Sequence, residues 1–170
     1  KIMVIDMDRM RTRKRELENR NKGNGGAGFW RPQDGEQVIR IVPTQDGDPF
    51  KDYWFHYNVG NQPGFLSPKK NFGEDDKLDQ FVRQLFNEGT EDSRKMAKDL
   101  MAKQRFFAPV VVRGEEDRGV MVWGFSKTVY ETLLNLVLNP EYGDITDPEA
   151  GTDLLISYGK PAGQSFPVTK

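Results

Sequence analysis

The sequence predicts an α+β, β-rich fold, built on a small β-barrel that carries a helix between two of its strands. Two short runs rich in valine and aromatic residues, 105–113 and 120–125, flank a charged turn bounded by glycines, which is typical of a β-hairpin. Directly afterwards the apolar residues change to helical spacing over Val129–Leu138, with Ser126 as the predicted N-cap and Pro140 as the stop. A hairpin that leads straight into a capped amphipathic helix favours this class.

Three further runs supply the other predicted strands. Residues 37–43 and 50–58 read as strands before the hairpin, and residues 153–159 read as the closing strand. Strand alternation predicts that the run 50–58 places aromatic side chains on both faces, so we expect at least one large ring outside the core. The first face holds Tyr53, Phe55 and Tyr57, and the second holds Trp54, His56 and Asn58. The alternative is a strand that is buried on both faces.

Changes in composition along the chain predict its domain organisation. The predicted parts are a basic arm with a glycine-rich linker over 1–28, a single core over 29–170, and a subdomain inserted into that core over 60–104. The insert begins with an irregular loop over 60–73. Two helices then follow, one ending at Gly89 and the other beginning at Thr90.

The N-terminal arm over residues 1–22 is strongly basic, which is typical of a flexible arm that becomes helical when it binds a partner. A solvated helix or a disordered leader is equally compatible with its composition. The glycines of residues 23–28 match the pattern G-x-G-x-x-G. A dinucleotide site would need a buried strand before these glycines and a helix after them. Here a charged arm precedes them and Phe29-Trp30-Arg31-Pro32 follows, so a flexible linker is the better interpretation.

Several functions are excluded or disfavoured by what the sequence lacks. A chain of 170 residues with no cysteine and one histidine has no disulfide, no thiolate metal site and no metal site built from several histidines of its own. No phosphate-binding loop of the Walker type, signal peptide or membrane-spanning apolar run is visible, and the acidic loop 141–151 lacks the spacing of a calcium loop. The sequence therefore predicts a protein that is not an enzyme and has no membrane partner.

Basic residues are interleaved with aromatic residues around the predicted barrel. This combination is typical of single-stranded nucleic-acid binding, because cations follow the phosphates while rings stack on bases of any sequence. The candidate phosphate ligands are Lys51, Lys69, Lys70, Arg94, Lys98, Lys103, Arg105 and Arg113. The candidate stacking rings are Trp54, Tyr57, Phe72, Phe106 and Trp123. Phe106 and Trp123 lie in predicted strands, so the alternative for them is a place in the core.

Five stretches, 37–43, 52–57, 104–107, 110–116 and 135–147, carry a family resemblance. The chain resembles the single-stranded-DNA-binding, helix-destabilising protein of T-even-type tailed bacteriophages, and most of all its marine cyanophage versions. The resemblance covers nearly all of residues 29–168. It implies an OB-fold barrel with an inserted subdomain, and a cleft between the two that holds the DNA strand.

The same resemblance implies a function and partners. The implied function is sequence-tolerant, cooperative binding and protection of single-stranded DNA in phage replication, recombination and repair, in the cytoplasm of the infected bacterial host. The basic cluster Arg11, Arg13, Lys14 and Arg15 resembles the family's arm for self-association along the strand. Phage replication proteins are expected partners through an acidic C-terminal tail that is not part of this sequence. Two alternatives stay open, namely a replisome interaction module without DNA binding and an RNA-binding translational regulator.

The family usually holds a structural zinc ion with one histidine and three cysteines. His56 matches the histidine, but the cysteine positions fall near Ser67, Asp76 and Asp79. A closed structural site is built from thiolate and imidazole ligands, so we expect no metal and no other cofactor. The insert must then be held together by its own apolar residues.

Overall fold

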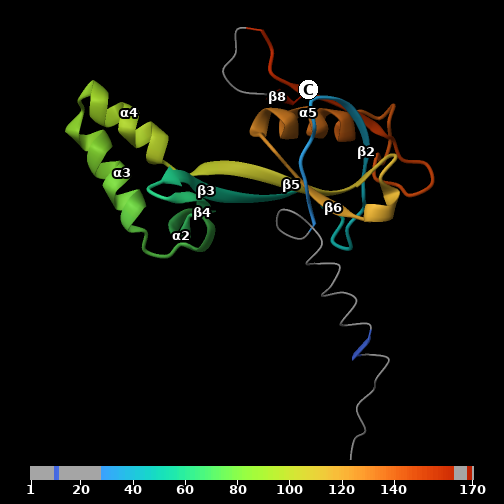
Figure 1. The fold of residues 1–170 in the computed structure, drawn as a ribbon, viewed down its shortest axis with the longest axis horizontal. Helices are drawn as coiled ribbons and strands as arrows, with labels where there is room; N and C mark the ends of the chain where they lie inside the picture. Colours follow the sequence, from blue (N-terminus) through green and yellow to red (C-terminus); the bar gives the residue numbers. More distant parts are fainter. Residues whose placement is uncertain (1–9, 12–27, 163–167, 170) are drawn as a thin grey trace, which may run out of the picture.

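The computed structural model describes residues 10–11, 28–162 and 168–169. Figure 1 shows a β lobe and a helical lobe at opposite ends of a long two-stranded ribbon. The described part is a mixed, β-rich α+β structure, as the strand and helix patterns predict. No helix in the described part is long and apolar enough to cross a membrane.

The strands of the described part belong to one sheet, whose main path runs β1-β6-β5-β2-β7-β8. Their bounds are β1 Phe29–Trp30, β2 Gly35–Ile41, β5 Lys103–Val112, β6 Met121–Phe125, β7 Leu154–Gly159 and β8 Val168–Thr169. All pairs on this path are antiparallel except β1 with β6. The predicted hairpin and closing strand are confirmed, whereas the two-residue strands β1 and β8 are too short to show a sequence period.

Helix α5, Lys127–Leu138, follows β6 directly and packs on the core of the β lobe (Figure 1). Ser126 occupies the predicted N-cap position, although its side chain makes no capping hydrogen bond. Alternate residues of the central strands face this core, as a period of two requires. They are Ile39 and Ile41 of β2, Phe106, Ala108, Val110 and Val112 of β5, and Met121, Trp123 and Phe125 of β6.

The ribbon consists of β3, Lys51–Val59, paired with the first half of β5, while β2 pairs with the second half. The single long strand β5 therefore belongs to both lobes. Beyond the ribbon, β3 turns back into β4, Gln62–Leu66. The turn uses left-handed backbone at Asn58 (φ 54°) and Gly60 (φ 57°), a conformation that asparagine and glycine tolerate best.

The helical lobe contains α2 (Pro68–Phe72), α3 (Lys77–Glu88) and α4 (Glu91–Leu100). Val82, Leu85 and Ala97 form its small buried core. The predicted boundary between the two longer helices is confirmed: left-handed Gly89 ends α3 and Thr90 caps α4.

The prediction of an irregular loop over residues 60–73 is wrong, because β4 and α2 occupy most of this segment. Two local signals explain the difference. Gly60 allows the hairpin turn, and Ser67 followed by Pro68 is a capped helix start in which the Ser67 hydroxyl accepts from the Lys70 amide.

Candidate nucleic-acid interface

The register of the ribbon assigns each ring of β3 to one face of the sheet. Tyr53 lies opposite Arg105, and Phe55 lies opposite Lys103. Residues directly opposite each other project from the same face, and alternate residues share that face. Tyr53, Phe55 and Tyr57 therefore lie on the face of Lys103 and Arg105, as the alternation predicts.

The rings of this face meet around Phe107. Its ring centroid lies 6.2 Å from Phe29, 6.2 Å from Tyr53 and 6.0 Å from Phe55, and Phe55 stacks on Tyr57 at 5.8 Å. Phe29 is 55% exposed and Tyr53 is 44% exposed. We call these five rings the aromatic strip. It runs from β1 of the β lobe along the ribbon that leads to the helical lobe.

Three predicted cations accompany the aromatic strip. Lys51, Lys103 and Arg105 alternate with its rings along β3 and β5, so they share its face. Burial raises the pKa of Tyr57, and the positive charge of Arg105 opposes part of that rise. Lys51 is paired with Asp46 at the surface. The strip thus combines partly open rings with cations at the spacing of alternate strand residues.

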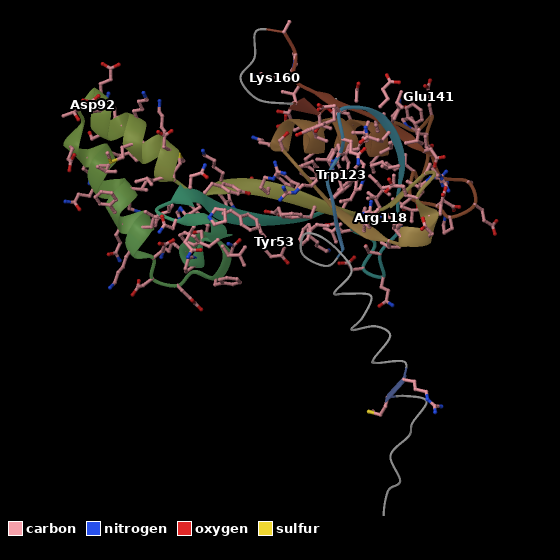
Figure 2. All side chains as sticks on the ribbon, in the orientation of Figure 1. Tyr53, Asp92, Arg118, Trp123, Glu141 and Lys160 are labelled. Atoms are coloured by element: carbon pink, nitrogen blue, oxygen red, sulfur yellow. The ribbon has the colours of Figure 1, made fainter. Side chains whose placement is uncertain are left out.

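Phe106 and Trp123, predicted as stacking rings, lie in the core of the β lobe instead. Phe106 is 6% exposed and stacks on Tyr130 with centroids 4.1 Å apart, and Trp123 is 0% exposed. Figure 2 shows Tyr53 on the ribbon and Trp123 inside the β lobe. Neither buried ring can stack on a base in this fold, so we correct both assignments.

Four rings of the strip are not among the candidates predicted from the sequence, namely Phe29, Tyr53, Phe55 and Phe107. The missed signal is the alternation of β5. Ala108, Val110 and Val112 are apolar and are two residues apart, so Phe106 continues the buried series and Phe107 belongs to the other face.

A second set of predicted residues gathers at α2. Trp54 projects from the face of β3 opposite to the strip, and Lys70 Nζ lies 5.3 Å from the centroid of its ring. Asn71 fastens α2 to β3, because its side chain accepts from the Trp54 amide at 2.9 Å and donates to the Trp54 carbonyl at 2.7 Å. Lys69 is exposed on the same helix, and Phe72 at its end is 60% exposed. These residues are accessible but do not belong to the strip.

The remaining predicted cations lie apart from the strip. Arg94 and Lys98 line a shallow surface hollow on α4 together with Lys95. Arg113 is bound to Asp153, with Nη2 3.0 Å from Oδ1, and this bond, joined by one from Arg40, holds the pKa of Asp153 below its usual range. Of the four predicted arm residues, only Arg11 lies within the described residues; Arg13, Lys14 and Arg15 lie outside them.

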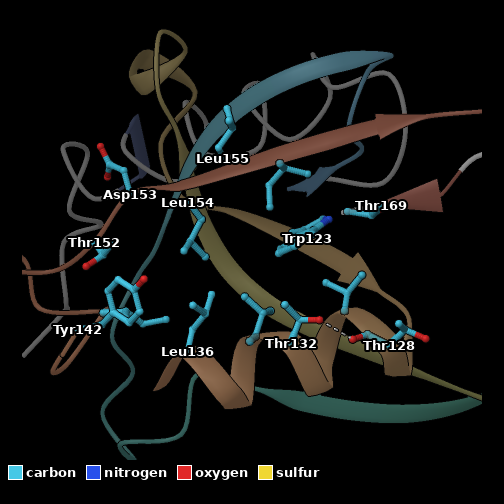
Figure 3. Close-up of a pocket in the computed structure, with 14 residues that line it drawn as sticks. Trp123, Thr128, Thr132, Leu136, Tyr142, Thr152, Asp153, Leu154, Leu155 and Thr169 are labelled. Atoms are coloured by element: carbon cyan, nitrogen blue, oxygen red, sulfur yellow. Dashed lines mark hydrogen bonds between the residues drawn. The ribbon is translucent and has the colours of Figure 1, made fainter. Parts of the chain in front are cut away.

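An apolar hollow of about 520 Å³ opens between α5 and β7, where Leu133, Leu136 and Leu154 are among its lining residues. Figure 3 shows Trp123 in its wall. The Nε1 of Trp123 is buried and has no hydrogen-bond partner among the described residues. The described lining carries no lysine or arginine, so this hollow offers no cation to a phosphate.

The residues at the family's zinc positions form a buried hydrogen-bond network. His56 Nε2 lies 3.1 Å from Asp76 Oδ2, which also accepts from the Ser67 hydroxyl at 3.1 Å. His56 Nδ1 lies 2.8 Å from the Leu100 carbonyl oxygen. Both imidazole nitrogens therefore face acceptors, and only the doubly protonated ring donates to both. Asp76 Oδ1 also accepts from the first amides of α3, so one carboxylate joins β3, the start of α2 and α3.

This donor set does not fit a closed structural zinc site. Both carboxylate oxygens of Asp76 already accept hydrogen bonds. Burial raises the pKa of Asp76, but the hydrogen bonds from His56, the Asp79 amide and Ser67 lower it by more, so the net pKa lies below its usual value. Asp79 turns instead to Arg83, with Oδ2 3.0 Å from Nη2. No group of three or more histidine, cysteine or acidic residues suited to a metal occurs in the described part.

Comparison with known families bears on the partner of this chain. Residues 33–170 match the family described as gp32 DNA binding protein like. The chain belongs to the gp32-like DNA-binding family. The match spans both lobes and every ring of the aromatic strip except Phe29, so DNA is the partner that this family membership supports. A search of the curated proteins finds no match to the chain.

Proposed function

We propose that this chain binds single-stranded DNA without sequence preference, and that it coats and protects the strand during phage replication, recombination and repair. The observation that carries the proposal is the aromatic strip with Lys103 and Arg105 on the same face. Each stacked base contributes roughly 1–3 kcal/mol whatever its identity, and each cation can follow a phosphate. No catalytic step is part of this proposal.

The strip favours single strands over duplexes for a physical reason. A paired base has both of its faces covered by its neighbours in the helix, so exposed rings such as Phe29 and Tyr53 can stack only on bases that are free. Binding of duplex DNA would then rest on phosphate contacts alone. The rings themselves accept RNA as readily as DNA, and membership of a DNA-binding family favours DNA.

We further propose that the β lobe is an OB-fold barrel with the residues 60–104 inserted as a subdomain. The helix α5 between strands β6 and β7 of this lobe, and the paired strands β3 and β5 that lead from the lobe to the insert, support this assignment. The cleft of such a protein would lie along the ribbon that joins the lobes, where the strip is found. The α2 residues Lys69, Lys70 and Phe72 and the α4 residues Arg94 and Lys98 would extend the path of the strand.

The proposal extends to partners and location. Self-association along the strand would use the basic arm, and other phage replication proteins would bind to the coated strand in the cytoplasm of the infected host. Folding and binding would need no metal, because the buried bonds of His56, Ser67 and Asp76 occupy the family's zinc positions.

A fluorescence titration with oligo-dT, an RNA of equal length and a duplex tests the proposal. We expect the tightest binding to oligo-dT and clearly weaker, more salt-sensitive binding to the duplex. Tighter binding of RNA would favour the translational regulator. Absence of binding to all three would favour the interaction module.

A further inference from the structure

We propose that Gly64 and Gly124 are positioning residues that lay two rings of the aromatic strip, Tyr57 and Phe107, across the sheet so that each ring offers a face to a base. The inference rests on the proposed function, since it assigns two stacking platforms within that site. It concerns the neighbouring strands β4 and β6, which carry no ring of the strip themselves.

Each glycine lies directly opposite its ring in the register, Gly64 opposite Tyr57 and Gly124 opposite Phe107. The Tyr57 atoms Cδ1 and Cε1 lie 3.1 and 3.2 Å from the point where a Cβ on Gly64 would stand. The Phe107 atoms Cε1 and Cδ1 lie 3.1 and 3.3 Å from the same point on Gly124. Opposite Cβ atoms in a sheet are normally about 4.5–5.5 Å apart, so each ring has moved over the neighbouring strand into the space a side chain would fill.

The backbone gives no other reason for either glycine. Both lack the left-handed φ that favours glycine elsewhere in this chain, such as at Gly60 or Gly89. Glycine weakens a strand interior because it loses more conformational freedom and packs no side chain, and it often marks a place that something approaches closely. Here the approaching groups are the two rings.

A ring laid across the sheet presents its π face outward, whereas a ring that stands upright presents an edge. Base stacking needs the face. At Gly124 the arrangement includes a cation as well, because Arg105 Nη2 lies 3.5 Å from the same Cβ point. That distance is ordinary van der Waals contact, so a Cβ at position 124 would displace the ring and leave the guanidinium in place. At Gly64 the neighbouring ring of the strip is Phe55, which stacks on Tyr57 with an angle of 26° between the ring planes.

The test replaces each glycine and compares two ligands. Gly124→Ala, Gly124→Val, Gly64→Ala and Gly64→Val are titrated with oligo-dT and with an abasic oligonucleotide of equal length, which keeps the phosphates and lacks the bases. Gly159→Ala and Gly159→Val are the matched controls, because Gly159 also lies in a strand without left-handed φ, and a Cβ there meets nothing within 4 Å.

We expect Gly124→Val to lower the affinity for oligo-dT by about 5-fold or more, the range of one lost stacking contact, with the alanine variant between it and the parent. The affinity for the abasic strand should change less than about 2-fold, since phosphate contacts persist. In a Phe107→Ala background, Gly124→Val should have little further effect, because the ring it displaces is gone. Gly64→Val should behave in the same way with Tyr57→Ala.

Equal losses for oligo-dT and the abasic strand would overturn the inference, because a general structural defect acts on both ligands. A full effect of Gly124→Val in the Phe107→Ala background would overturn it too, as would controls at Gly159 that lose as much. Failure of the parent chain to bind oligo-dT would contradict the proposed function itself. If the parent chain binds oligo-dT normally and the glycine variants bind it equally well, the proposed function stands and only the role of the two glycines is ruled out. If a valine variant does not fold, thermal melting will show this, and the comparison of the two ligands is then made with the alanine variants.

Discussion

Two neighbours in β5, Phe106 and Phe107, show how one position along a strand changes the role of a ring. Phe106 packs on Tyr130 and Phe125 in the core, while Phe107 meets Phe29 and Tyr53 on the open face. The chemistry of the side chains is identical, so the difference comes from the direction of the strand and from what covers each face.

Alanine substitutions at Phe106 and Phe107 should therefore change different properties, stability in the first case and DNA affinity in the second. Phe107→Ala should lose roughly 1–3 kcal/mol of affinity for oligo-dT with little change in melting temperature. Phe106→Ala should lose about 3–5 kcal/mol of stability, the usual cost of deleting a buried phenylalanine. Thermal melting and titration of both variants check this. The assignment of faces would be wrong if Phe107→Ala proved the less stable of the two.

Arg105 lies opposite Tyr53 in the register, and its Nη2 and the Phe107 ring lie within 3.5 Å of the same Cβ point on Gly124. Each phosphate neutralised on a single strand contributes about −0.7 to the slope of log affinity against log salt concentration. Arg105→Ala should make that slope shallower by about this amount, as measured by titration at several salt concentrations. Arg118→Ala is the control, because Arg118 pairs with Glu115 in the turn after β5 and should leave the slope unchanged. An unchanged slope for Arg105→Ala would mean that its guanidinium meets no phosphate.

At the scale of elements, the helical lobe is fastened to the ribbon by a few buried polar groups as well as by its small apolar core. Asp76 caps α3 and accepts from His56 of β3, whose other nitrogen faces the last carbonyl of α4. A single side chain thus links several elements, and its loss should loosen their joint packing.

The stability that Asp76 provides should depend on pH in the acid range. Its pKa in the folded chain lies below the value of about 3.9 expected in the unfolded chain. As pH falls, the unfolded chain therefore takes up the proton first. The contribution is complete above about pH 5 and is lost as the pH falls through 4 toward the folded-state value.

Asp76→Asn should consequently destabilise the chain by on the order of 3 kcal/mol at pH 7, because it leaves His56 without its charged partner. The difference in the free energy of unfolding between this variant and the parent should be smaller at pH 3.5. Urea unfolding at pH 7, 5 and 3.5 measures it. Asp79→Asn, which breaks only the pair with exposed Arg83, is the control. A gap that stays constant with pH would show that the Asp76 charge is not what stabilises the lobe.

Purified protein should also contain no stoichiometric zinc, and a chelator should leave its melting temperature unchanged. Zinc normally becomes part of the folding free energy through thiolate ligands, and this chain has no cysteine. Elemental analysis and melting with and without chelator check both points. One tightly held zinc ion per chain would mean that His56 and Asp76 rearrange to ligate it.

The sequence predicts some of these elements better than others, for identifiable reasons. Periodicity and caps predict the β5–β6 hairpin and helices α3, α4 and α5, because those signals are local. Alternation predicts that Tyr53, Phe55 and Tyr57 share a face, but not that this face is open. That choice depends on distant contacts, such as α2 covering Trp54, which no local pattern contains.

The role proposed for Gly64 and Gly124 is even harder to predict from a single sequence. Gly64 and Gly124 look like ordinary strand glycines until the register sets them opposite Tyr57 and Phe107. Register follows from the pairing of whole strands. It therefore becomes known only with the fold.

At the scale of the whole molecule, the aromatic strip connects the lobes. Phe29 of β1 lies at its β-lobe end, and Phe107 of β5 contacts both Phe29 and Phe55, which stacks on Tyr57 of β3. Figure 1 shows β3 and β5 running from the β lobe toward the helical lobe. A strand that follows these rings passes along the ribbon. Its bound length is then limited by the reach of one molecule, so many molecules are needed to coat a long strand, and in the proposed function they contact one another along it.

Those contacts are the proposed role of the basic arm. Deleting residues 1–22 removes Arg11, Arg13, Lys14 and Arg15 and leaves every ring and cation of the strip in place. The arm-deleted protein should bind a short oligonucleotide, with room for one molecule, nearly as well as the full chain. On a long single strand it should lose cooperativity, because each molecule then binds without help from its neighbour.

Titrations of a short and a long oligo-dT with both proteins separate the two contributions. The full chain should fill the long strand over a narrow range of protein concentration, and the arm-deleted protein over a broad one. A matched variant that changes the four basic residues to alanine tests whether charge rather than length is responsible. Equal losses on short and long strands would instead place the arm on the DNA itself, beside the strip, where its cations would add to the salt slope by about 0.7 for each phosphate met.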